Sequence, residues 1–189
     1  NTTGDTSGCI LVGQDRGVIE VLRKATLTKV ACQVAEYASE WVGAADMFPY
    51  AHCLAKLYSR KDDGGNVRQP YIVVETNNGG DGCQLPLRKA GWGRMHPWMR
   101  YDKKVIDASK ASHLGVITTA WSRELVVGYL ATALKDGIID INSPWFIQEM
   151  QSLEAGMTEG GRTRIAAVLG RHDDRFMALG WIYLALHVT

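Results

Sequence analysis

The sequence lacks the features that would assign it to several common classes of protein. Its 189 residues contain 21 Lys and Arg against 20 Asp and Glu, so neither charge is in large surplus. A histone-like blanket of positive charge is therefore excluded, and any contact with nucleic acid must come from a local patch. No apolar run reaches the roughly 20 residues that span a bilayer, and the first residues do not resemble a secretory signal peptide.

Patterned cysteines and two common catalytic signatures are also absent from the sequence. Its four cysteines, Cys9, Cys32, Cys53 and Cys83, form no Cys-x-x-Cys pair. This spacing argues against a zinc cluster or a disulfide scaffold and favours reduced cysteines in a cytosolic protein. There is no Gly-x-x-x-x-Gly-Lys-Ser/Thr loop of a P-loop ATPase and no Gly-x-Ser-x-Gly elbow of a serine hydrolase.

The residues that are present predict a folded domain of mixed α/β class. Hydrophobic residues make up 46% of the chain, which is enough for a core. The apolar runs 9–12 and 18–22 predict a β-hairpin. Apolar residues at three- and four-residue steps predict a helix over 28–41. The β-branched run 71–74 predicts a buried strand. Further helices are expected from about Pro49, from Thr119 to Gly137, from Trp145 to Leu153, and from Asp173 to the end, with a short strand at 138–141. This order predicts a mixed sheet covered by helices.

Acidic residues stand at the ends of three of these expected elements. Glu75 directly follows the buried strand, where open α/β sheets usually place their ligands. Asp173 and Asp174 lead into the apolar C-terminal helix, and Asp5 precedes the first strand. Each has a simpler explanation: Glu75 as the first solvated residue after a strand, an Asp as a helix N-cap, and Asp5 as a turn former.

The pair of acids before an apolar helix is harder to explain by capping alone. Crowded carboxylates repel each other unless a cation neutralises them. If the fold brings Asp5, Glu75 and Asp173 or Asp174 together, the site has only oxygen ligands. Such a site selects Mg²⁺ or Mn²⁺ over zinc.

Three motifs occur in an order that resembles a known family. They are Val73-Val74-Glu75-Thr76-Asn77-Asn78-Gly79, then Leu114-Gly115-Val116-Ile117-Thr118-Thr119 with Ser122-Arg123, then His172-Asp173-Asp174-Arg175-Phe176-Met177-Ala178-Leu179. In this order they resemble the C-terminal nuclease domain of the large terminase subunit of tailed bacteriophages, within the ribonuclease-H-like superfamily. The resemblance runs along nearly the whole chain. In addition, Gly4-Asp5-Thr6-Ser7 resembles the second half of that family's first motif.

The resemblance implies a ribonuclease-H-like mixed β-sheet flanked by α-helices and a two-metal endonuclease that cuts double-stranded DNA during genome packaging. Asp5, Glu75, Asp173 and Asp174 would be the catalytic residues and the ligands of two Mg²⁺ or Mn²⁺ ions, which activate water and stabilise the leaving oxygen. The family's principal first aspartate lies upstream of the Gly-Asp element. We therefore expect residues 1–189 to be one nuclease domain that lacks the leading strand and the upstream ATPase domain.

The same resemblance implies the partners and the cellular location. The partners would be double-stranded DNA, the terminase ATPase domain, the portal and the small terminase subunit, with no membrane. The location would be the cytoplasm of the infected bacterial host rather than the mature virion.

The segment from 88 to 123 is strongly basic in an otherwise neutral chain. It has eight basic residues against two acidic ones, a surplus of six, and aromatic residues are interleaved. The basic residues are Arg88, Lys89, Arg94, Arg100, Lys103, Lys104, Lys110 and Arg123. The alternative is that these residues form an ordinary solvated surface. The surplus of positive charge instead favours contacts with DNA phosphates, which depend on salt concentration and little on DNA sequence.

Two other functions remain open at the level of sequence. Another ribonuclease-H-like nuclease, such as a junction resolvase or an integrase-type phosphoryl transferase, would share the carboxylates but is not expected to carry the Leu-Gly-x-x-Thr-Thr element. A DNA-binding or motor-docking module with an incomplete nuclease site would fit a chain without the first aspartate.

Overall fold

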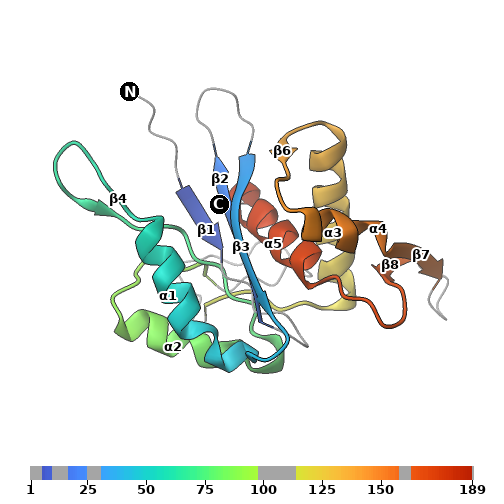
Figure 1. Ribbon diagram of the computed structural model, residues 1–189, viewed down its shortest axis with the longest axis horizontal. Coiled ribbons are helices and arrows are strands. Elements are labelled where there is room, and N and C mark those ends of the chain that lie inside the picture. Colours follow the sequence, from blue (N-terminus) through green and yellow to red (C-terminus); the bar gives the residue numbers. More distant parts are fainter. Residues whose placement is uncertain (1–5, 10–16, 25–30, 98–113, 158–162, 189) are drawn as a thin grey trace.

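The computed structural model describes residues 6–9, 17–24, 31–97, 114–157 and 163–188. Its central sheet has the strand order β1-β2-β3-β6, with bounds β1 (Thr6–Cys9), β2 (Gly17–Lys24), β3 (Ala31–Ser39) and β6 (Ile139–Asp140). The first three strands are antiparallel neighbours and β6 runs parallel to β3, so the sheet is mixed (Figure 1). The short strand near 138–141 is confirmed, and so is antiparallel pairing of the first two strands. The first strand is Thr6–Cys9, however, and residues 10–12 of the expected run 9–12 lie outside the described residues.

The helix expected over 28–41 is wrong, because Ala31–Ser39 is strand β3. The apolar residues that suggested it were Val30, Val34, Ala38, Trp41 and Val42, which recur at three- and four-residue steps. Such steps match a helical turn, but in the strand Val34 and Ala38 pack against different hydrophobic clusters, and the pairing of β3 with β2 shifts register between Val21 and Leu22. Pairing with β2 along the whole length of β3 decides in favour of the strand.

Helices cover both faces of this sheet. The helices and short 3₁₀ turns are η1 (Ala44–Met47), α1 (Phe48–Leu57), η2 (Asn77–Gly79), α2 (Asp81–Lys89), α3 (Ala120–Lys135), α4 (Pro144–Gln151) and α5 (Asp174–Val188). Figure 1 shows α1 and α2 on one side of the strands and α3 and α5 on the other. The helices expected from Pro49, Thr119, Trp145 and Asp173 are confirmed, whereas α2 was not predicted, and its last two residues fall in the region from Arg88 that was expected to be irregular.

Alternate residues of β2 supply two separate cores. Val18 and Leu22 pack with α3 and α5, where the buried Trp181 and Leu184 belong to the same cluster. Ile19 packs on the opposite face with residues of η1, α1 and α2. This alternation is the period of two expected of a strand that is buried on both faces.

The segment at 71–75 is extended and buried, but it pairs only through isolated bridges. Ile72 forms a parallel bridge with Met95, and Glu75 forms one with Val116. Val73 and Val74 are buried on opposite sides, in the two different cores. The predicted burial is therefore confirmed, while a continuous strand ladder is not present in this segment.

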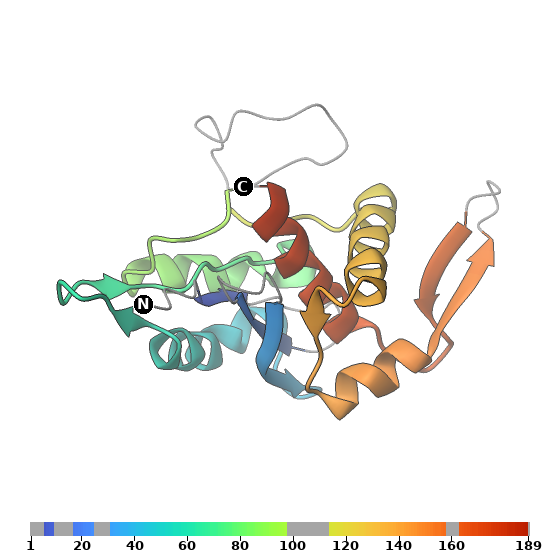
Figure 2. The same cartoon turned by 90° about the horizontal axis from the view of Figure 1, so that it is seen from above.

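Two small hairpins extend from the main body. They are β4 (Arg60–Lys61) with β5 (Val67–Arg68), and β7 (Leu153–Met157) with β8 (Thr163–Ala167). Figure 2 shows the two hairpins at opposite ends of the molecule. Among the described residues, no helix is both long and apolar enough to span a membrane.

Candidate active site

Glu75 lies at the end of the buried 71–75 segment and is only 3% exposed. Its neighbours hold the backbone on both sides: the Val116 N–H donates to the Val74 carbonyl, and the Thr76 N–H donates to the Val116 carbonyl, each at 2.8 Å. The 114–119 motif is thus a partner strand segment that fixes the Glu75 backbone. Glu75 is not the solvated residue after a strand that the simpler explanation required.

Gly115 allows this close approach. Its φ is +94°, and a Cβ at this position would lie 2.3 Å from the Val74 carbonyl oxygen. On the other side, a Cβ on Gly80 would lie 1.8 Å from the carbonyl oxygen of Glu75. Glycine is therefore required at both positions for backbone to pack against the Glu75 segment.

The side chain of Thr118 supports the Glu75 carboxylate. Its hydroxyl bonds with Glu75 and also accepts the Trp181 indole N–H at 2.9 Å. Its backbone is held by Asn77, whose amide donates to the Thr118 carbonyl at 2.9 Å while its oxygen accepts the Thr118 N–H at 2.8 Å. A chain of bonds therefore runs from helix α5 through Thr118 to Glu75.

Asp173 and Asp174 have different surroundings at the start of α5. The Asp173 carboxylate forms an ion pair with Arg123 of α3 and accepts the Ala167 N–H at 3.3 Å. Asp174 is 8% exposed, and its charge acts on Glu75. Asp174 is therefore the acid of this pair that shares an electrostatic environment with Glu75, while Asp173 links α5 to α3 and β8.

The surroundings raise the pKa of Glu75 from 4.5 to about 7. Burial is the main cause, and the negative charge of Asp174 raises the pKa further. The Thr118 hydrogen bond and the Arg123 guanidinium act in the opposite direction. Arg123 has a smaller effect on Glu75 than Asp174 has, so the nearby charges together oppose ionisation of Glu75.

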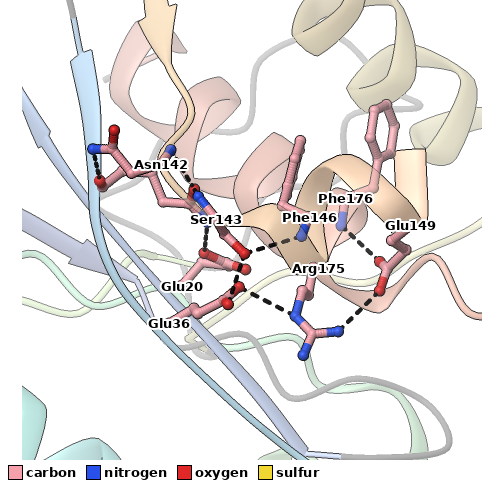
Figure 3. Close-up of polar contacts among 9 residues, drawn as sticks. Glu20, Glu36, Asn142, Ser143, Phe146, Glu149, Arg175 and Phe176 are labelled. Atoms are coloured by element: carbon pink, nitrogen blue, oxygen red, sulfur yellow. Dashed lines mark hydrogen bonds and ion pairs between the residues drawn. The ribbon is translucent and has the colours of Figure 1, made fainter. Parts of the chain in front are cut away.

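A second polar cluster anchors the start of α5 to the sheet and to α4 (Figure 3). The Arg175 guanidinium lies between two carboxylates, with Nε 3.2 Å from Glu36 Oε2 and Nη1 3.4 Å from Glu149 Oε2. Glu149 also accepts the Phe176 N–H at 3.0 Å, which satisfies a backbone donor in the first turn of α5. Because Arg175 directly follows Asp174, these contacts fix the backbone that carries Asp174.

Glu20 of β2 adds a further carboxylate to this cluster. It is fully buried, and its Oε2 accepts the Gln33 side-chain N–H at 2.7 Å. Burial raises the pKa of Glu20 well above its ordinary range, and the charges of Glu36 and Glu149 act in the same direction. The sequence interpretation missed Glu20, Glu36 and Glu149. An acid inside the apolar run 18–22 was the only available signal for Glu20.

The other predicted residues fall in three different places. Asp5 and the basic residues Arg100, Lys103, Lys104 and Lys110 lie outside the described residues. Arg88 and Lys89 are exposed in the last turn of α2, and Arg94 is exposed after it, with Nη1 donating to the Gln69 carbonyl at 2.9 Å. Arg123 is not on that surface, because its guanidinium is bound to Asp173.

The donor set at Glu75 and Asp174 suits a hard divalent cation. Both are buried carboxylates, and the charge of Asp174 disfavours ionisation of Glu75, which is the condition that a bound Mg²⁺ or Mn²⁺ would relieve. Within the ranges that the structure describes, no group of three or more His, Cys, Asp or Glu residues could hold a metal ion. The structure thus brings two of the predicted carboxylates, Glu75 and Asp174, into one electrostatic environment.

Comparison with known proteins gives a match in structure and none in sequence. No known family and no curated protein matches the sequence. The large terminase nuclease of thermophilic phage G20c with bound cobalt superposes with a TM-score of 0.65 at 16% identity, over 96% of this chain and 81% of the other. The same nuclease with bound magnesium gives 0.62 at 17% identity, over 97% and 82%.

A further structure extends the likeness to another phage. The large terminase nuclease domain of Thermus phage P74-26 gives a TM-score of 0.61 at 17% identity, over 96% of this chain and 78% of the other. A large terminase from a thermophilic bacteriophage, in complex with ADP, gives 0.58 at 13% identity, where 97% of this chain covers only 40% of the other. The predicted fold class, a ribonuclease-H-like mixed sheet flanked by helices, is confirmed.

Proposed function

We propose that this chain is a divalent-metal-dependent endonuclease domain that cleaves double-stranded DNA during phage genome packaging. The observation that carries the proposal is the pairing of Glu75 with Asp174, two buried carboxylates from distant parts of the chain, in a fold shared with large terminase nucleases. A purely structural role does not explain why two nearly buried acids that repel each other share one environment.

Glu75 and Asp174 would hold the metal, and Asp173 would orient the start of α5 through Arg123. A bound divalent ion supplies Lewis-acid activation of water and neutralises charge on the phosphodiester. Thr118 orients the Glu75 carboxylate by its hydroxyl, and the Arg175 contacts hold the Asp174 backbone. Asp5 is retained in this proposal as a further ligand, and the number of ions is proposed to be two, as the resemblance implies.

DNA would be held by its phosphates along the predicted basic surface. Arg88, Lys89 and Arg94 are the described members of that surface, and Arg123 is assigned to the carboxylate site instead. Phosphate contacts of this kind give little sequence preference, and the logarithm of the DNA-binding constant falls linearly with the logarithm of salt concentration. Replacing Arg88 and Lys89 together by Gln should reduce the salt slope of duplex binding by roughly two.

The test is cleavage of supercoiled plasmid in Mg²⁺ or Mn²⁺, with and without chelator. The variants are Glu75→Gln and Asp174→Asn, which remove charge and preserve shape, and the matched control is Glu154→Gln, because Glu154 is an exposed glutamate of β7. We expect the wild-type chain and the control to nick and linearise plasmid, and both site variants and the chelated sample to be inactive.

Other outcomes separate the remaining functions. Cleavage that survives both site substitutions would refute the metal site. Duplex binding without cleavage in any metal would favour the DNA-binding or motor-docking module. Selective cutting of four-way junctions over plasmid would favour a junction resolvase. The ATPase domain, the portal and the small subunit remain proposed partners, and the host cytoplasm remains the proposed location.

A further inference from the structure

A large open cavity lies beside the carboxylate site and is not used by the proposed cleavage reaction. Its volume is about 680 Å³, within the range of small-molecule sites. Three parts of the chain line it: the end of β3 with its following turn, the outer face of α4, and the residues that precede α5. His172 is part of its wall, and His172 Nδ1 lies 3.6 Å from Asp174 Oδ2. The cavity and the carboxylate site therefore adjoin.

Two tryptophan side chains at the cavity are exposed to solvent. Trp41 is 93% exposed and Trp145 is 60% exposed. An indole with this much exposure contributes little to the core, and large apolar side chains gathered at one place on a surface mark a binding site more often than chance. Their exposure therefore indicates an occupant that presents a flat, apolar face.

Both tryptophans stand on a well-held backbone. The Ser39 hydroxyl accepts the N–H groups of Trp41 and Val42 at 3.1 and 3.2 Å, which fixes the turn after β3. Trp145 lies in the first turn of α4, whose N-cap Ser143 accepts the Phe146 N–H at 3.0 Å and donates to Glu36 at 2.6 Å. Rigid aromatic supports lose little conformational entropy when a partner stacks on them.

The charges that line the cavity favour a nucleobase over a run of phosphates. Arg175 is neutralised by its contacts with Glu36 and Glu149, which leaves Arg171 and Glu40 as the exposed charged residues of opposite sign. One donor and one acceptor can pair with the polar edge of a base. A polyanionic backbone would instead require an excess of positive charge, which this lining does not have.

We propose that this cavity binds an unpaired nucleotide of the DNA strand next to the cleavage site, with its base stacked on Trp41 and Trp145. The proposal rests on the proposed function, because it takes DNA as the substrate and places the cut at Glu75 and Asp174. Stacking on aromatic side chains binds any base, so this subsite prefers single-stranded or frayed DNA over intact duplex without reading sequence. It would hold a strand end as the two strands separate after cutting.

The test measures binding of a fluorescein-labelled single strand of roughly 12 nucleotides by anisotropy, in chelator so that cleavage cannot occur. The variants are Trp41→Ala and Trp145→Ala. Trp121→Ala is the matched control, because Trp121 is an exposed tryptophan of α3 that does not line the cavity. We expect each cavity variant to weaken single-strand binding about tenfold, Trp145→Phe to restore most of it, and the control to bind as wild type.

A duplex of the same sequence separates this contact from the phosphate surface. Duplex binding should change little in the cavity variants and should fall when Arg88 and Lys89 are replaced. Single-strand binding that is equal in the cavity variants and in Trp121→Ala would overturn the proposal and would favour a protein partner on the two tryptophans. The anisotropy assay needs no cleavage, so the two proposals can fail separately. If the nuclease proposal fails, the plasmid assay will show no cleavage while single-strand binding by the cavity stays intact.

Discussion

Replacement of Glu75 by Gln should stabilise the metal-free protein at alkaline pH. The pKa of Glu75 is about 7 in the folded chain against 4.5 for an ordinary glutamate. A carboxyl group whose folded pKa is raised stabilises the fold below its unfolded pKa, and this contribution is lost as pH rises through the folded pKa. At 1.36 kcal/mol for each pKa unit, the full loss is about 3 kcal/mol, of which roughly 2–3 kcal/mol falls between about pH 5 and about pH 8.

The measurement is urea unfolding of wild type and Glu75→Gln in chelator across this pH range. We expect the Gln variant to become more stable than wild type as pH rises, by roughly 2 kcal/mol or more near pH 8. Other titrating groups, such as His96, contribute to both proteins and cancel in the difference. Glu154→Gln is the matched control and should follow wild type, because Glu154 is exposed.

Addition of Mg²⁺ should reverse the order of stability at alkaline pH. A cation binds the ionised carboxylate of wild type, so folding is stabilised by mass action. The Gln variant lacks this carboxylate and should gain much less from the metal. If wild type and Glu75→Gln keep the same pH dependence in chelator, the assignment of the raised pKa to Glu75 is refuted.

Three further predictions concern the supports of the site. Burial lowers the pKa of His96 from 6.5 to about 4. The stability that His96 confers above pH 6.5 should therefore be lost as pH falls towards 4, by about 3 kcal/mol in total. In urea unfolding, His96→Gln should lack this pH dependence of stability. Arg175→Met leaves the carboxylates of Glu36 and Glu149 without their cation and should cost roughly 3–5 kcal/mol in the same assay, whereas Arg68→Met at an exposed ion pair should cost much less. Gly115→Ala should lower the thermal midpoint because its Cβ meets the Val74 carbonyl oxygen. Gly128→Ala, inside α3 with open space around it, should instead raise stability by up to about 1 kcal/mol. Equal effects of the two substitutions would contradict the close-packing explanation.

The sequence predicted four of the helices and the short strand near 138–141, but not every element. Glu75 and Asp174 were found because each adjoins a strongly apolar run, and such runs are the most reliable local signal. Strand β3 was mistaken for a helix because the three- and four-residue steps between its apolar residues match a helical turn, whereas its pairing with β2 becomes apparent only in the fold. Helix α2 was missed because Pro86 and its charged last turn hide a short apolar face.

The supports of the site were harder to predict because they depend on contacts between distant residues. The 114–119 motif was noticed as a motif, yet its parts have separate roles: Gly115 allows close packing, Thr118 bonds with Glu75, and Thr119 caps α3. Arg123 was counted with the basic surface because its charge is visible in the sequence. Its partner Asp173 lies 50 residues away and becomes apparent only in the fold.

Two acidic clusters flank the start of α5, and they differ in how their charge is balanced. Glu36 and Glu149 share the guanidinium of Arg175, so the chain itself supplies their cation. Glu75 and Asp174 have Arg123 nearby, but its guanidinium is bound to Asp173, and it affects the pKa of Glu75 less than Asp174 does. The first cluster can therefore remain closed and structural, whereas ionisation of Glu75 beside Asp174 is disfavoured below about pH 7 and would be favoured by a cation from outside. This difference is why we propose that the metal binds at Glu75 and Asp174 and that Arg175 holds the backbone that carries Asp174.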